Sequence, residues 1–117
     1  MPKTINYPLA KKLYDAGVVI ESEYYYSSYK WENDFIICPK EDTCTAEYDY
    51  FPATNCEEVI EFLKRDISIQ YSDIFNQYVI SNKTKDTVIF RDTLLEALEA
   101  TLEYLLTNGY IWQNTKN

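Results

Sequence analysis

The chain has 117 residues and a formal net charge of −8, with 19 acidic residues against 11 basic ones. This length allows one domain with one hydrophobic core. The negative charge argues against binding of nucleic acid or of an anionic membrane through a general electrostatic field. Histidine, the usual general base and metal ligand, is absent. We therefore expect a non-enzymatic protein that uses no cofactor and no metal.

The first expected element is a short helix over residues 7–16. Asn6 is a suitable N-cap, Pro8 fits the first turn, and Gly17 allows the left-handed conformation that ends a helix. The residues expected on its inner face are Leu9, Leu13 and Tyr14.

Residues 18–39 change to extended structure, because β-branched and aromatic residues dominate this stretch. The turn chemistry of residues 32–34 predicts a hairpin whose returning strand covers residues 35–38. A third strand is expected over residues 46–51, where apolar and acidic residues alternate.

A capping box predicts the start of a second helix. Thr54 and Glu57 have the S/T-x-x-E spacing in which each side chain satisfies a backbone N–H of the first turn. Lys64 and Arg65 then complement the dipole at the other end of this helix. Its inner stripe is expected to consist of Val59, Ile60, Phe62 and Leu63.

Two further strands are expected over residues 75–81 and 87–90, joined by a polar connection. Residues 66–73 favour neither helix nor strand. Six leucines at helical spacing predict a third helix over residues 92–108, with Asp92 able to cap its start.

These elements predict a single α+β domain over residues 1–117. Its mostly antiparallel sheet has about four or five strands and is covered on one face by the two or three helices. Residues 113–117 are expected to form a frayed polar tail.

The chain contains 12 tyrosines, and several of them fall in residues 24–31. On a strand, Tyr24 and Tyr26 point to one face, and we expect these two to be the more buried. The opposite face would carry Tyr25, Tyr29 and Trp31. This face is either ordinary strand surface or an aromatic binding surface for a partner. The leading hypothesis is a binding or adaptor protein that uses this surface to hold a protein partner.

Four carboxylates form a strip within roughly 60° on one side of the third helix. They are Asp92, Glu96, Glu99 and Glu103, and no Lys or Arg occurs between residues 92 and 108. The strip is either simply solvated or contacts a basic partner. The second case would make the protein an acidic inhibitor, of the immunity or nucleic-acid-mimic type. We expect all four carboxylates to be exposed.

The side of the third helix opposite its leucines carries Ala97, Ala100 and Tyr104. Such a side allows close approach of another helix, from the same fold or from a second copy. Two acidic strips would repel each other, so we expect a monomer or a weak homodimer.

Cys38, Cys44 and Cys56 are an odd number of cysteines, which is a poor disulfide framework. Reduced thiols fit better, and we expect the protein in a cytoplasm. The chain has neither a CxxC motif nor a histidine, so zinc binding is not expected. A cysteine nucleophile normally needs a histidine base, so cysteine catalysis is not expected either.

Four short segments of the chain together form a pattern that is seen in other small proteins. They are LAKKLYDAG at residues 9–17, YYY at residues 24–26 with Trp31, PAT before EEVIEFL at residues 52–63, and EALEA at residues 96–100. In these segments the chain resembles small proteins encoded in prophages and mobile elements of gut bacteria. The resemblance covers about half of the chain and implies a genomic setting, without an activity or site residues.

Overall fold

The computed structural model describes residues 3–29, 35–43, 48–83 and 87–110. Within these ranges the chain forms three α-helices, six strands and one 3-10 turn. The elements in chain order are α1 (Tyr7–Asp15), β1 (Tyr24–Tyr29), β2 (Phe35–Pro39), η1 (Lys40–Asp42), β3 (Tyr48–Pro52), α2 (Cys56–Leu63), β4 (Ile67–Ser72), β5 (Gln77–Asn82), β6 (Val88–Arg91) and α3 (Leu94–Thr107).

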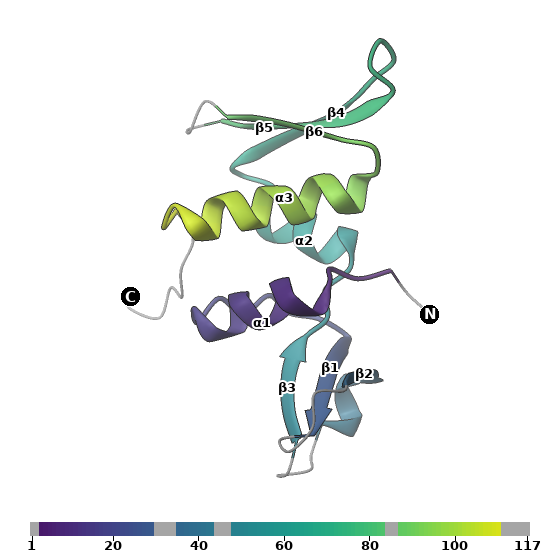
Figure 1. The fold of residues 1–117 in the computed structure, drawn as a ribbon, viewed down its shortest axis with the longest axis vertical. Helices are drawn as coiled ribbons and strands as arrows, with labels where there is room; N and C mark the ends of the chain where they lie inside the picture. The colour runs from purple at the N-terminus through teal and green to yellow at the C-terminus, as the bar shows by residue number, and fades with distance from the viewer. Residues whose placement is uncertain (1–2, 30–34, 44–47, 84–86, 111–117) are drawn as a thin grey trace.

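The α+β class and the antiparallel pairing are confirmed, but the strands form two sheets instead of one. Each sheet has three strands, in the orders β2-β1-β3 and β4-β5-β6. Figure 1 shows the two sheets at opposite ends of the longest axis, with the helices between them. This arrangement gives a radius of gyration of 15.0 Å and extents of 47 × 35 × 22 Å. A compact domain of this length would have a radius of about 13 Å.

Helix α1 begins and ends as its sequence predicts. The Asn6 side chain accepts a hydrogen bond from the Leu9 backbone N–H at 2.9 Å, and Gly17 has a φ of 80°. Leu9 and Leu13 are buried, whereas Tyr14 is 47% exposed. The Tyr14 ring packs edge-on against Phe51 of β3, with ring centroids 5.0 Å apart. Tyr14 therefore covers the edge of the core without entering it.

The N-cap of helix α2 lies one residue later in the chain than the capping box of the sequence predicts. Its N-cap is Asn55, whose side chain accepts from the Glu58 N–H, while the Glu58 carboxylate accepts from the Asn55 N–H, both at 2.9 Å. Thr54 is instead buried in an extended segment, where its carbonyl accepts from the Ile5 N–H. The pairing with the N-terminal segment thus shifts the cap from Thr54 and Glu57 to Asn55 and Glu58. Phe62, expected on the inner stripe, is 40% exposed.

The unassigned segment at residues 66–73 contains strand β4, which pairs with β5 as an antiparallel hairpin. The predicted strands at residues 75–81 and 87–90 correspond to β5 and β6. In the register, Ile80 of β5 lies opposite Ile69 and Ile89. Ile80 is fully buried, so this face of the sheet belongs to the core.

Helix α3 is central and is buried on more than one side. It contacts β5, β6, α1 and α2. Ala97, Leu98 and Leu102 are all 0% exposed. The Thr87 hydroxyl donates to the Tyr104 hydroxyl at 2.9 Å, which places the Ala97 and Tyr104 side of α3 toward the β4-β5-β6 sheet. This small-residue side therefore packs within the fold.

The cap of α3 is Thr93, whose hydroxyl accepts from the Glu96 N–H, and not the Asp92 suggested by the sequence. None of the described helices has the length and apolar character needed to cross a membrane.

Candidate binding site

The pairing of β1 with both neighbouring strands places several aromatic residues on one face. Directly opposed residues of antiparallel strands share a face. Tyr29 and Ser27 of β1 lie opposite Tyr48 and Tyr50 of β3, and Tyr25 lies opposite Cys38 of β2. We call this surface the outer aromatic face; its members are Tyr25, Ser27, Tyr29, Ile36, Cys38, Tyr48 and Tyr50.

The rings of the outer aromatic face support one another. Tyr29 and Tyr48 have ring centroids 5.2 Å apart, and Tyr48 and Tyr50 are stacked at 6.3 Å with an interplanar angle of 25°. The four tyrosines are half-buried, Ile36 is 63% exposed, and no member of the face carries a charge. Rings held by their neighbours lose little side-chain entropy when a partner covers them.

The inner face of the same sheet packs against α1. Tyr26 is only 5% exposed, its hydroxyl donates to the Ile5 carbonyl at 2.7 Å, and its ring meets Tyr7 of α1 edge-on at 5.4 Å. Phe35 stacks on the same Tyr7 ring, with centroids 4.2 Å apart. The prediction that Tyr26 is buried is confirmed, whereas Tyr24 is only half-buried.

Two of the three predicted binding residues lie on the outer aromatic face. Tyr25 and Tyr29 share it, and Trp31 falls outside the residues that the structure describes. Sequence reasoning missed Tyr48 and Tyr50 as members of this site. Their alternation with acidic residues did indicate a common face, but it could not reveal that β3 pairs with β1.

The acidic strip of α3 is partly engaged by the rest of the fold. The Glu99 carboxylate accepts hydrogen bonds from Asn6, and Lys12 forms an ion pair with Glu103 at 2.9 Å. The Asp92 carboxylate accepts from the Gln77 side chain at 3.1 Å. Asp92 and Glu96 are exposed as expected, but Glu99 and Glu103 are half-buried, contrary to expectation. Helix α1 supplies the counter-charge that α3 itself lacks.

A cavity of about 470 Å³ lies along the acidic strip. Arg91 and Gln77 from the second sheet line it together with the four carboxylates. A cation of the chain itself therefore already faces the strip, which reduces its value as a surface for a basic partner.

The described thiols are poor nucleophiles. Burial, followed by the nearby Asp42 carboxylate, raises the pKa of the Cys38 thiol. Burial, followed by the carboxylates of Glu99 and Glu57, raises the pKa of Cys56. Both thiols are thus mostly protonated at neutral pH. In residues 3–29, 35–43, 48–83 and 87–110, no group of three or more Cys, Asp and Glu side chains is arranged to hold a metal ion.

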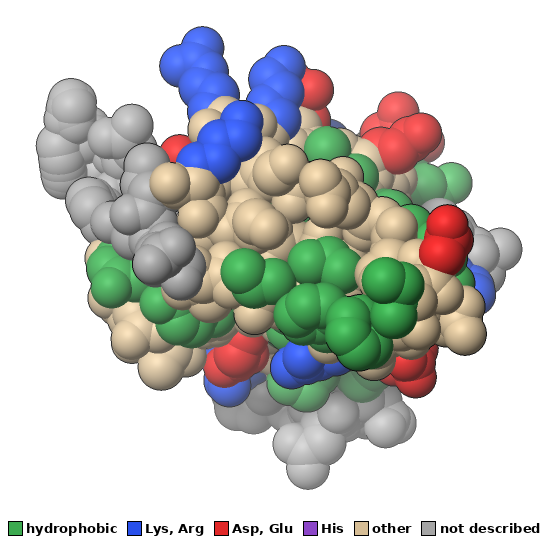
Figure 2. All heavy atoms as spheres, turned by 90° about the horizontal axis from the view of Figure 1, so that it is seen from above, with side chains coloured by type: hydrophobic (Ala, Val, Ile, Leu, Met, Phe, Trp, Pro, Cys, Tyr) green, Lys and Arg blue, Asp and Glu red, His purple; other side chains and the backbone are tan. Residues whose placement is uncertain are grey.

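A second apolar patch lies on the outer face of β4-β5-β6. Figure 2, which views this end of the molecule, shows hydrophobic side chains gathered there. Val88 and Phe90 of β6 are 52% and 39% exposed. Phe75 of the β4–β5 turn is 62% exposed and packs edge-on against Phe90 at 5.8 Å. This patch carries fewer aromatic rings than the outer aromatic face.

Among the described surfaces, the outer aromatic face combines the most rings with the absence of charge. The acidic strip, by contrast, is partly occupied by contacts with α1. No protein-family model, curated protein or solved structure matches this chain.

Proposed function

We propose that the protein is a non-enzymatic binding or adaptor protein that holds a protein partner on the outer aromatic face. The observation that supports this most directly is the gathering of Tyr25, Tyr29, Tyr48 and Tyr50 on one side of one sheet, where the described residues of the face carry no charge. The cores of protein interfaces are enriched in tyrosine and depleted of charged residues. A surface with this composition suits a partner whose own contact area is apolar or aromatic.

A protein is favoured over nucleic acid as the ligand. Platforms that stack bases normally lie inside a basic groove. The described residues of the outer aromatic face include no cation, and the chain as a whole has a net charge of −8. A protein partner requires neither a basic groove nor cations on this face.

A photo-cross-linking amino acid in place of Tyr48 tests this proposal in the source cells. A matched probe in place of Phe75, which is exposed in the β4–β5 turn of the other sheet's hairpin, is the control. We expect a partner that cross-links from position 48 and not from position 75. The resemblance to prophage proteins suggests that products of neighbouring genes be tested first as partners.

Once the partner is purified, its affinity for variants of the chain measures the contribution of individual tyrosines to binding. The double variant Tyr25→Ser/Tyr29→Ser should weaken its affinity at least about tenfold, as expected for interface aromatic residues. Tyr71→Ser, which removes a 50% exposed tyrosine elsewhere, should leave the affinity unchanged. Equal affinity of the partner for the unmodified chain, the double variant and Tyr71→Ser would refute the proposed site.

The salt dependence of the same complex distinguishes the acidic-inhibitor alternative. Aromatic contacts depend little on ionic strength, whereas a carboxylate-driven complex weakens steeply as salt is added. A steep salt dependence, together with loss of binding on Asp92→Asn/Glu96→Gln, would replace the proposed function by the acidic inhibitor.

A further inference from the structure

A groove with both apolar and acidic side chains opens between α2, residues 19–24 and the β2–η1 junction. Its volume is about 920 Å³. The apolar side chains that line it are Val19, Ile20, Tyr24, Pro39 and Phe62. Val19 is 53% exposed and Phe62 is 40% exposed. An apolar ligand group could therefore bury surface that the folded chain leaves in contact with water.

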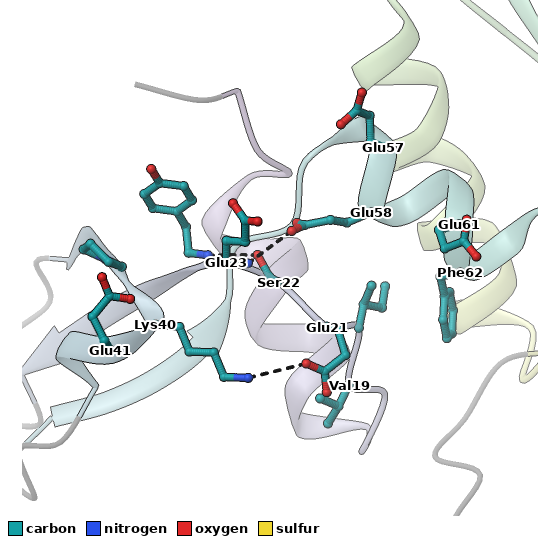
Figure 3. A pocket seen from close by; sticks show the side chains of 13 residues that line it. Val19, Glu21, Ser22, Glu23, Lys40, Glu41, Glu57, Glu58, Glu61 and Phe62 are labelled. Atoms are coloured by element: carbon teal, nitrogen blue, oxygen red, sulfur yellow. Dashed lines mark hydrogen bonds and ion pairs between the residues drawn. The ribbon is translucent and has the colours of Figure 1, made fainter.

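Six carboxylates line the same groove; we call them its carboxylate rim and the five apolar side chains its apolar floor. The carboxylates are Glu21, Glu23, Glu41, Glu57, Glu58 and Glu61, and Figure 3 shows that they come from all three segments that form the groove. The groove includes one cation, Lys40, which forms an ion pair with Glu21 at 3.5 Å.

Three of the six carboxylates already have partners within the fold. Besides Glu21, Glu61 pairs with Lys64 at 2.6 Å, and Glu58 caps α2 and accepts from the Glu23 backbone N–H at 3.1 Å. The remaining three have no side-chain hydrogen bond or ion pair to any described residue. They are Glu23, Glu41 and Glu57.

We propose that this groove binds a segment of a protein partner that presents Lys or Arg beside a large apolar side chain. The apolar side chain would cover Val19 and Phe62, and the cation would meet the carboxylates that have no partner in the described fold. The net charge of −8 would also speed the encounter with a basic segment. The groove contains no residue of the outer aromatic face, so this is a second site, independent of the first.

The charge of the groove selects this occupant over a second copy of the chain. A second copy would bring its own net charge of −8 against the carboxylate rim. A basic peptide segment is complementary to both the rim and the apolar floor.

The probe for this site is a short fluorescein-labelled peptide of alternating Lys and Leu, whose binding is followed by fluorescence anisotropy. Two control peptides replace every Lys by Glu, or every Leu by Ser. We expect only the Lys–Leu peptide to bind. Equal binding of the Lys–Ser peptide would show general electrostatic attraction and would overturn the proposal.

Charge-matched protein variants locate the binding. Glu23→Lys/Glu41→Lys changes two groove carboxylates, and Asp73→Lys/Glu96→Lys makes the same change in net charge at exposed positions outside the groove. The first pair should weaken the affinity by at least about tenfold, or about 1.4 kcal/mol. The second pair should change it by a much smaller factor. An equal loss for both pairs would show that net charge alone attracts the peptide, which overturns the site.

The apolar floor has its own matched test. Phe62→Ser should weaken the affinity for the Lys–Leu peptide about tenfold, while Phe75→Ser, at an exposed position of the β4–β5 turn, should have no effect. Circular dichroism melts check that each variant is folded. Displacement of the peptide by millimolar free arginine, with Phe62→Ser neutral, would assign the groove to small cations and refute a peptide site.

Discussion

Glu99 of α3 lies at the N-terminus of α1, where its carboxylate contacts Asn6. The Glu99 Oε2 atom accepts from the Asn6 backbone N–H at 2.7 Å and from the Asn6 side-chain amide at 3.1 Å. Asn6 is the N-cap of α1, so the carboxylate lies at the positive end of that helix dipole. The carboxylate of Glu99 in α3 thus stabilises the N-terminus of the neighbouring helix α1.

Glu99→Gln should therefore lower the free energy of unfolding by about 1 kcal/mol, because it removes the charge from two hydrogen bonds and from the helix terminus. Asp73→Asn is the control, since Asp73 is an exposed carboxylate of the β4–β5 turn and lies outside every helix. Urea denaturation of both variants measures the difference. Equal stabilities would show that the contact with Asn6 contributes nothing.

The N-cap of α2 gives a second matched pair of adjacent residues. Glu58→Ala removes one half of the capping box and should destabilise the protein by about 1 kcal/mol. Glu57→Ala, at an exposed position in the same turn, should cost less than half as much. Thermal melts distinguish the two, and a larger loss for Glu57→Ala would restore the cap that the sequence suggested.

The buried leucines of α3 predict a large loss of stability. Leu98→Ala and Leu102→Ala should each cost about 2–5 kcal/mol, because both side chains are fully buried and would leave cavities. Leu106→Ala, at a half-buried position of the same helix, should cost less. Denaturant melts that show a loss under about 1 kcal/mol for both buried sites would contradict the orientation of α3.

Cys56 predicts a pH-dependent reactivity. In a Cys38→Ser/Cys44→Ser background, the reaction of Cys56 with a thiol reagent should reach half its maximal rate at a pH above the pKa of an ordinary thiol. The reason is that burial and two carboxylates raise the pKa of Cys56. Adding Glu99→Gln removes one negative charge and should shift this midpoint to lower pH. Glu96→Gln should leave it unchanged. Identical pH profiles for the two variants would exclude Glu99 as a cause of the raised pKa.

Features that depend on a few consecutive residues could be predicted from the sequence. The cap at Asn6, the stop at Gly17 and the β1–β2 hairpin each result from local chemistry. The period of a strand likewise predicted that Tyr25 and Tyr29 share a face and that Tyr26 lies on the opposite one. These outcomes depend on backbone geometry, which is the same in every fold.

The tertiary structure decided which of these local faces meet. Pairing of β3 with β1 added Tyr48 and Tyr50 to the outer aromatic face, and packing of α1 on α3 gave Glu99 a partner 93 residues away. The bond from Ile5 to the Thr54 carbonyl likewise moved the α2 cap by one residue. Alternation and helical spacing specify which residues share a side, but they carry no information about the partner of that side. That choice depends on the burial and hydrogen bonding of the whole chain together, and so the site could not be completed from the sequence.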